Sequence, residues 1–202
     1  MQLMSKKALL DLFFETVHTH PSRIAIRWRE GVLSYAQLAK FVEQIASAIA
    51  ACTEEGPIAI QQSRSPLLVA SLLGAWMAGR PFVALDPRHP AFRRQHIIEE
   101  AMPAMVLTDA DFQRITTGDG GLTELVPHET DIAYILYTSG STGTPKGISL
   151  TDRGVAALVA WAHARYTSDE LACVLASTTI TFDLSIFEIF VPLTCAQSLY
   201  LV

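Results

Sequence analysis

The sequence contains few cysteines and no grouped metal ligands, and these shortages exclude two classes of site. Its 202 residues hold three cysteines, at positions 52, 173 and 195, an odd number without a C-x-x-C spacing. Three cysteines in this arrangement predict neither a disulfide framework nor a zinc site, and they favour a reducing, cytoplasmic setting. The six histidines also lack the grouping of metal ligands, so we predict no metal site made by this chain.

Positive charge and long apolar runs are also scarce. Lysine and arginine number 15 against 20 acidic residues, which gives a formal net charge of −5. Without a basic stripe to neutralise phosphates, we expect no nucleic-acid partner. The longest apolar window, residues 66–79, is shorter than the about 20 residues that span a bilayer, so we expect no membrane partner. Asp11 and Glu15 interrupt the apolar N-terminal run, which indicates an amphipathic helix rather than a secretion signal.

Apolar residues, in contrast, make up half of the sequence, and only 17% of residues are charged, as in a globular protein with a core. Short apolar runs alternate with segments of helical period, one of which follows a capping-box pattern at Ser34 and Gln37. This alternation predicts an α/β fold with mainly parallel sheets and covering helices. We expect strands at 23–28, 31–35, 57–61, 82–85, 104–108, 132–138, 172–177 and 198–202, helices at the N-terminus, 34–49, 65–79, 92–102, 154–165 and after 182, and a surface connection over 109–131.

The last 32 residues are unusually poor in charge. From Leu171 to Val202 only Asp183 and Glu188 are charged, so this region is expected to lie deep inside a domain. A chain that ends at Val202 on a strand would leave an open sheet edge with apolar neighbours. We therefore expect residues 1–202 to be a fragment of one larger domain or one half of a split protein.

The segment YTSGSTGTPKG, Tyr137 to Gly147, follows the apolar run IAYIL and is rich in glycine, serine and threonine. Glycines let backbone N–H groups approach a ligand closely and hydroxyls add donors, so the segment suits phosphate oxygens. It differs from the familiar phosphate loop, in which glycine directly precedes lysine, because Pro145 precedes Lys146. Two interpretations remain, a different nucleotide loop or a flexible turn, and the preceding strand favours the first.

A second segment, TFDLSIFEIF (Thr181 to Phe190), places apolar residues on one helical stripe and puts Asp183 and Phe187 on another face. Asp183 has two interpretations. It is a helix N-cap, or it is a carboxylate in apolar surroundings that takes a cationic ligand group as its partner. Glu188 is expected to be a solvated or capping carboxylate rather than a catalyst.

Four segments together resemble, in order and spacing, the core motifs of amino-acid-activating adenylation domains of nonribosomal peptide synthetases. That family belongs to the adenylate-forming superfamily, with acyl-CoA synthetases and luciferases. LSYAQL (33–38) is similar to the first motif, LLGAWMAGRPFVALDP (72–87) to the second, YTSGSTGTPKG to the third and FDLSIFEIF (182–190) to the fourth. The resemblance implies that residues 1–202 are the N-terminal portion of the large subdomain, its AMP-binding region, incomplete at the C-terminus.

The resemblance also implies roles for individual residues. The third motif would hold the β and γ phosphates of ATP through Thr138, Ser139, Gly140, Ser141, Thr142, Gly143 and Lys146. Asp183 would pair with the α-ammonium of an amino-acid substrate, and Leu184 and Phe187 would line the pocket for its side chain. The implied reaction is attack of the amino-acid carboxylate on the α-phosphorus of Mg-ATP, which gives an aminoacyl adenylate and pyrophosphate. A carrier-protein domain would then capture the adenylate with its phosphopantetheine thiol.

The same resemblance places the catalytic lysine, the Mg²⁺ ligand and the adenine and ribose contacts of the family beyond Val202. We therefore assign no catalytic residue, and we expect the chain to be inactive without the missing downstream half. The family often has a histidine or a Glu-His pair after the third motif, where this chain has Thr151 and Asp152. Two alternatives remain open, a fragment of a carboxylate–CoA ligase and a non-catalytic structural half of a split enzyme.

Overall fold

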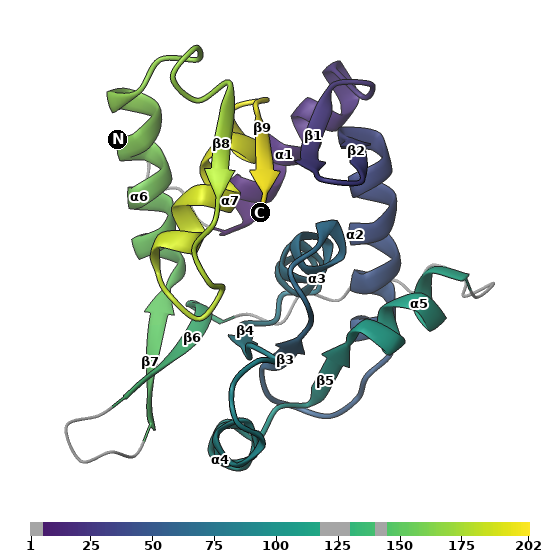
Figure 1. Ribbon diagram of the computed structural model, residues 1–202, viewed down its shortest axis with the longest axis vertical. Helices are drawn as coiled ribbons and strands as arrows, with labels where there is room; N and C mark the ends of the chain where they lie inside the picture. Colours follow the sequence, from purple (N-terminus) through teal and green to yellow (C-terminus); the bar gives the residue numbers. More distant parts are fainter. Residues whose placement is uncertain (1–5, 118–129, 140–144) are drawn as a thin grey trace.

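The computed structural model describes residues 6–117, 130–139 and 145–202. Its helices are α1 (Lys6–Thr19), α2 (Tyr35–Ala50), α3 (Pro66–Met77), α4 (Ala91–Ala101), α5 (Asp109–Thr117), α6 (Asp152–Arg165) and α7 (Leu184–Thr194). The strands form two sheets (Figure 1). One sheet has the order β2 (Gly31–Ser34), β1 (Ile24–Trp28), β9 (Ser198–Leu201) and β8 (Cys173–Ala176). The other has the order β5 (Met105–Thr108), β3 (Ile58–Gln61), β4 (Phe82–Ala84), β6 (Ile132–Ser139) and β7 (Pro145–Thr151).

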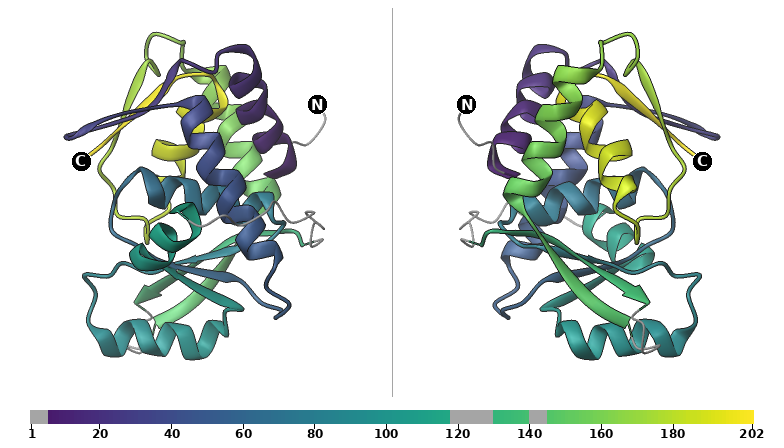
Figure 2. Two further views of the ribbon diagram at one scale, coloured as in Figure 1. Left: turned by 90° about the vertical axis from the view of Figure 1, so that its right-hand side faces the viewer. Right: turned by 90° about the vertical axis from the view of Figure 1, so that its left-hand side faces the viewer.

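Both sheets are mainly parallel, as the alternation of strands and helices predicts. The pairs β1–β2 and β6–β7 are antiparallel, and the other strand pairs described are parallel. Helix α3 lies between the two sheets, and α4 lies on the far side of the five-stranded sheet (Figures 1 and 2). Alternate residues of β3 accordingly face different layers, because Ile58 and Ile60 join the main core while Ala59 packs in a smaller cluster with Ile97 of α4. No helix in the described part of the chain is long and apolar enough to cross a membrane.

Local sequence signals place the helix starts correctly. The Ser34 hydroxyl accepts a hydrogen bond from the Gln37 N–H, and the Gln37 side chain accepts one from the Ser34 N–H, which completes the predicted capping box. At the start of α3 the Ser65 hydroxyl accepts a hydrogen bond from the Leu68 N–H, with Pro66 at the first helical position. Helices α2 and α3 then approach so closely that a Cβ at Gly74 would lie 2.6 Å from Ile45 Cγ2.

The expectation of an open sheet edge at Val202 is wrong, because β9 is an inner strand. It pairs in parallel with β1, at Ile26 and Leu199, and with β8, at Leu175 and Tyr200. The strand pairing leaves β8 at the edge of the sheet. The expectation that residues 171–202 lie deep inside the domain is also only partly correct, since Leu175 is 56% exposed.

Two elements escape the sequence patterns. Helix α5 begins within the segment that we expected to be a surface connection, where its first residues, Asp109 and Asp111, are acidic as helix starts favour. Strand β7 begins at Pro145, inside the segment that we assigned to a loop. It exists because it pairs with β6, and tertiary pairing of this kind has no local sequence signal.

Candidate functional site

The glycine-rich segment begins and ends on the β6–β7 hairpin. Thr138 lies opposite Lys146, and Ser139 lies opposite Pro145, so the two ends of the proposed phosphate segment are held side by side. Thr138 and Lys146 are exposed. The residues between them that we expect to contact phosphate, Gly140, Ser141, Thr142 and Gly143, lie outside the described residues.

The backbone of Gly147 on β7 packs closely against an aromatic ring of β6. A Cβ at Gly147 would lie 3.0 Å from Tyr137 Cζ and 3.1 Å from its hydroxyl oxygen. The Tyr137 ring is itself buried in the small cluster under α4. The glycine at the end of the motif therefore lets β7 pass over Tyr137, a packing role that the sequence alone does not reveal.

Asp183 precedes α7 but does not cap it. Its backbone is already helical, with φ −59° and ψ −31°, and its side chain makes no capping hydrogen bond, so the interpretation as a side-chain N-cap is wrong. Asp183 is also exposed in this chain, so the expectation that its own burial demands a partner is wrong as well. The carboxylate lies near Tyr134 of β6, whose pKa is raised to about 12 by burial and, to a smaller extent, by the charge of Asp183.

The two predicted pocket residues lie on the same end of α7 as Asp183. Leu184 is 49% exposed, whereas Phe187 is half-buried against the main core. The Phe187 and Tyr166 rings form a T-shaped pair, with 5.8 Å between their centroids. The structure thus brings Asp183, Leu184 and Phe187 to one surface, which is partly open.

A stack of aromatic rings connects this surface to the hairpin of the glycine-rich segment. Phe190 of α7 stacks on Trp76 of α3 at 4.2 Å, Trp76 stacks on Phe82 at 5.9 Å, and Phe82 stacks on Tyr134 at 5.4 Å. The Trp76 indole N–H also donates to the Ala133 carbonyl at 2.8 Å. Helix α7, which directly follows Asp183, and the strand that leads to the glycine-rich segment are therefore fixed relative to each other by one packed core.

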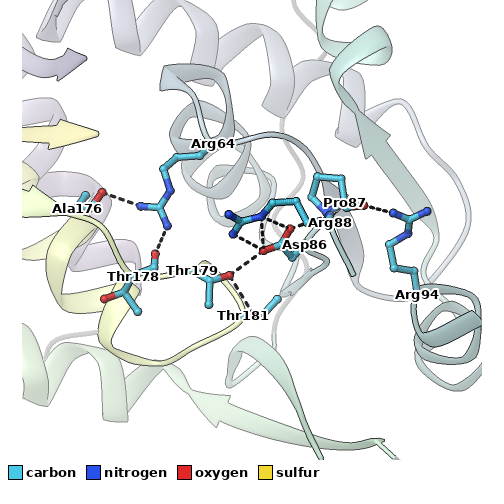
Figure 3. A network of polar contacts seen from close by, with 9 residues as sticks. All are labelled: Arg64, Asp86, Pro87, Arg88, Arg94, Ala176, Thr178, Thr179 and Thr181. Carbon is cyan, nitrogen blue, oxygen red and sulfur yellow. Dashed lines mark hydrogen bonds and ion pairs between the residues drawn. The ribbon is translucent and has the colours of Figure 1, made fainter. Parts of the chain in front are cut away.

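A polar network lies beneath the β8–α7 loop, residues 177–183 (Figure 3). Asp86, which follows β4, accepts hydrogen bonds from the Arg88 side chain, the shortest at 2.7 Å, and from the Thr179 hydroxyl at 3.1 Å. Arg64, from the connection between β3 and α3, donates to the carbonyls of Ala176 and Thr178. The side chains of Arg64, Asp86, Arg88, Thr178 and Thr179 line a cavity of about 140 Å³ between the two sheets.

Glu188 faces this network from α7, and the expectation of a solvated or capping carboxylate is wrong for it. It is 8% exposed, and it accepts hydrogen bonds from the Thr178 N–H at 2.9 Å and from the Thr178 hydroxyl at 2.6 Å. Sequence reasoning assigned no role to Arg64 or Asp86 either. The only early signal was their chemistry, since charged groups beside apolar runs need partners when they are buried.

The Asp86 network predicts a specific dependence of stability on pH. Hydrogen bonds from Arg88 hold the Asp86 pKa well below its ordinary value of 3.8. Because the folded pKa lies below the unfolded pKa, the stabilisation is complete above about pH 5 and is lost as the pH falls further. We expect Asp86→Asn to lower the free energy of unfolding at pH 7 and to flatten its fall toward acid, measured by urea unfolding at several pH values.

A matched control separates this effect from general acid denaturation. Asp11→Asn changes an exposed carboxylate of α1, and it should leave the wild-type slope in place. Parallel stability curves for the wild type and Asp86→Asn would show that the Asp86 carboxylate does not contribute in this way.

Metal ligation is not provided by the described residues. Within that part of the chain, no group of three or more His, Cys, Asp and Glu side chains could hold a metal ion. The three cysteines are free in the structure. The described residues therefore supply no all-protein cage for a metal ion.

Comparison with known proteins shows the family of this chain. The pattern of the family described as AMP-binding enzyme matches residues 13–202, and the chain belongs to this family. One component of the mycosubtilin synthase of Bacillus subtilis is 30% identical over 92% of this chain, and one component of the linear gramicidin synthase of Brevibacillus parabrevis is 32% identical over 95% of it. This chain covers 8% of the first protein and 4% of the second.

Solved structures share the fold. The N-terminal subdomain of Klebsiella oxytoca NpsA, in complex with 3-hydroxyanthranilyl-AMSN, has a TM-score of 0.82 and 27% identity. That similarity covers 99% of this chain and 54% of the NpsA subdomain chain. The nonribosomal peptide synthetase FmoA3 has a TM-score of 0.83 at 23% identity, over 96% of this chain and 22% of its own, which supports the α/β architecture.

Proposed function

We propose that residues 1–202 are the N-terminal portion of one adenylation domain that activates an amino acid with ATP for loading onto a carrier protein. The observation that carries the proposal is the shared core between two motifs. The stack from Phe190 to Tyr134 links the helix of Asp183 to the strand that leads into the glycine-rich segment. Membership of the AMP-binding family and the similarity to the mycosubtilin and linear gramicidin synthases support the same function.

In this proposal the β6–β7 hairpin holds the phosphates of ATP, and the residues at the start of α7 hold the amino acid. The phosphate contacts are Thr138, Ser139, Gly140, Ser141, Thr142, Gly143 and Lys146. Asp183 holds the α-ammonium, while Leu184 and Phe187 contact the side chain of the amino acid. A carboxylate oxygen then forms a bond to the α-phosphorus, the bond between this phosphorus and the bridging oxygen breaks, and pyrophosphate leaves. These residues contribute positioning and charge stabilisation rather than proton transfer.

Other components of the reaction lie outside this chain in our proposal. The catalytic lysine and the Mg²⁺ ligand belong to the downstream half of the domain, and a phosphopantetheine-bearing carrier domain accepts the activated amino acid. Mg²⁺ would neutralise phosphate charge when bound. We also keep the prediction of a cytoplasmic setting, which three free cysteines support.

A second candidate is activation of a carboxylic acid that has no α-amino group. It is favoured by one neighbour, since the NpsA subdomain is also described in complex with 3-hydroxybenzoyl-AMSN. The presence of Asp183 favours the amino acid instead, because a carboxylate placed there has a charge partner only if the substrate is an ammonium.

Exchange of labelled pyrophosphate into ATP tests the proposal. We expect exchange when the chain is supplied with the downstream half of an adenylation domain, and only with certain amino acids. The chain alone should show none. Exchange that occurs with simple carboxylic acids but with no amino acid would reject the proposal in favour of the second candidate.

A further inference from the structure

The β8–α7 loop, which ends at Asp183, is held by charged groups on both of its sides. From the β3–α3 connection, the Arg64 guanidinium donates to the Ala176 carbonyl at 2.6 Å and to the Thr178 carbonyl. From α7, the Glu188 carboxylate accepts from the N–H and the hydroxyl of Thr178. Every polar group of Thr178 is therefore bonded to a charged partner, and such bonds are about twice as strong as neutral ones.

Arg64 and Glu188 also act on each other through their charges. Burial lowers the pKa of Arg64, and the negative charge of Glu188 opposes that shift. A buried carboxylate is costly unless it is hydrogen-bonded and near a positive charge, and both conditions are met here. Thr178 thus lies between the Arg64 guanidinium, from the β3–α3 connection, and the Glu188 carboxylate of α7. Figure 3 shows the Arg64 side of this arrangement.

The constraint extends along the chain to Asp183. Thr179 donates to Asp86 and shares a hydrogen bond with the Thr181 hydroxyl at 3.2 Å. The Phe182 N–H donates to the Thr179 carbonyl at 3.0 Å, which forms the turn that leads into α7. Backbone bonds therefore connect the clamped Thr178–Thr179 pair to the residue next to Asp183.

We propose that Arg64 and Glu188 are positioning residues that fix the β8–α7 loop and thereby set the place of the Asp183 carboxylate. Neither residue contacts the amino acid. The inference rests on the proposed function, because the role of Asp183 as the ammonium contact comes from that proposal. We call the hydrogen bonds of Arg64 and Glu188 to Thr178 the clamp. Removing part of the clamp should weaken recognition of the amino acid and leave the phosphate contacts of the hairpin unaffected.

A matched pair at Thr178 is the sharpest test. Thr178→Val keeps the shape but removes the hydroxyl that donates to Glu188, whereas Thr178→Ser keeps the hydroxyl. In pyrophosphate exchange with the downstream half supplied, we expect Thr178→Val and Glu188→Gln to raise the KM for the amino acid roughly tenfold, as small misplacements of a contact do. The KM for ATP should stay unchanged, and Thr178→Ser should behave as the wild type.

Arg64→Lys tests the other side of the clamp, since one ammonium cannot reproduce the fork that bonds two carbonyls. Its control is Arg94→Lys, because Arg94 donates to the Pro87 carbonyl, away from the loop (Figure 3). Arg64→Lys should raise the KM for the amino acid, and Arg94→Lys should leave it as it is. Equal changes in the KM for ATP and for the amino acid would overturn the proposal.

Amide hydrogen exchange on the 202-residue chain separates the two proposals. It needs no activity, and we expect the Thr178, Phe182 and Ser185 amides to exchange roughly tenfold faster in Thr178→Val than in Thr178→Ser. Equal exchange rates in the two variants would reject the clamp. Absence of pyrophosphate exchange by the wild type would instead reject the proposed function.

Discussion

Asp183→Asn should reduce amino-acid activation by at least about a hundredfold when the downstream half is supplied, since breaking an enclosed ion pair costs about 3 kcal/mol or more. The asparagine keeps the shape of the side chain but removes the charge that we propose pairs with the substrate ammonium. The measurement is kcat/KM for the amino acid in pyrophosphate exchange. An unchanged kcat/KM would reject the ammonium contact.

The size of the effect of Asp183→Asn depends on whether the downstream half of the domain encloses the carboxylate. In the described chain the carboxylate faces solvent. An ion pair in that position is worth only about 0.2–1 kcal/mol, so direct binding of the amino acid to the 202-residue chain should change by roughly fivefold at most. Asp169→Asn, at another exposed aspartate, is the matched control and should change neither quantity.

Trp76→Ala should cause the largest loss of stability among single substitutions in the described core, about 3–5 kcal/mol for removal of a large buried ring. Trp76 is 2% exposed, stacks on both Phe190 and Phe82, and donates to the Ala133 carbonyl. The substitution leaves a cavity between the two sheets and removes the indole N–H that donates to the Ala133 carbonyl of β6. Urea unfolding measured by circular dichroism gives the change in free energy.

Two further tryptophan variants show where this stability originates. Trp161 is 53% exposed on α6, so Trp161→Ala should change the free energy of unfolding by less than about 0.5 kcal/mol. Trp76→Phe keeps a stacked ring and loses the indole N–H, so its loss should fall between those of the two alanine variants. Similar losses for Trp76→Ala and Trp161→Ala would show that the aromatic stack does not hold the layers together.

Local chemistry made much of the fold predictable. A capping box and a Ser-Pro helix start depend on residues within one turn, and α2 and α3 begin where Ser34 and Ser65 indicate. The parallel sheets follow from alternating strands and helices, but the order of the strands does not. Nothing in the pattern of SLYLV shows that β9 is an inner strand, because its neighbours come from distant parts of the chain.

Some residues of the candidate site could be recognised in the sequence, and others could not. Thr138, Lys146 and Asp183 stand in motifs whose composition could be recognised in the sequence. The groups that hold the loop could not be recognised, because Arg64 and Glu188 meet at Thr178 only after the two sheets pack together. The sequence pattern indicated a solvated Glu188 because its partners lie ten residues away in a loop, beyond the reach of helical periodicity.

The inner position of β9 has a consequence for how the chain folds. Strand β1 forms its hairpin with β2 early in the sequence, yet its other edge pairs at residue 26 with residue 199. At a synthesis rate of roughly 5–20 residues per second, that edge stays unpaired for about ten seconds or more while the intervening chain is made. Closing so long a loop also slows folding, because the entropy must be lost before the contact forms. During translation the first hairpin therefore exposes a strand edge with which a second nascent chain can pair.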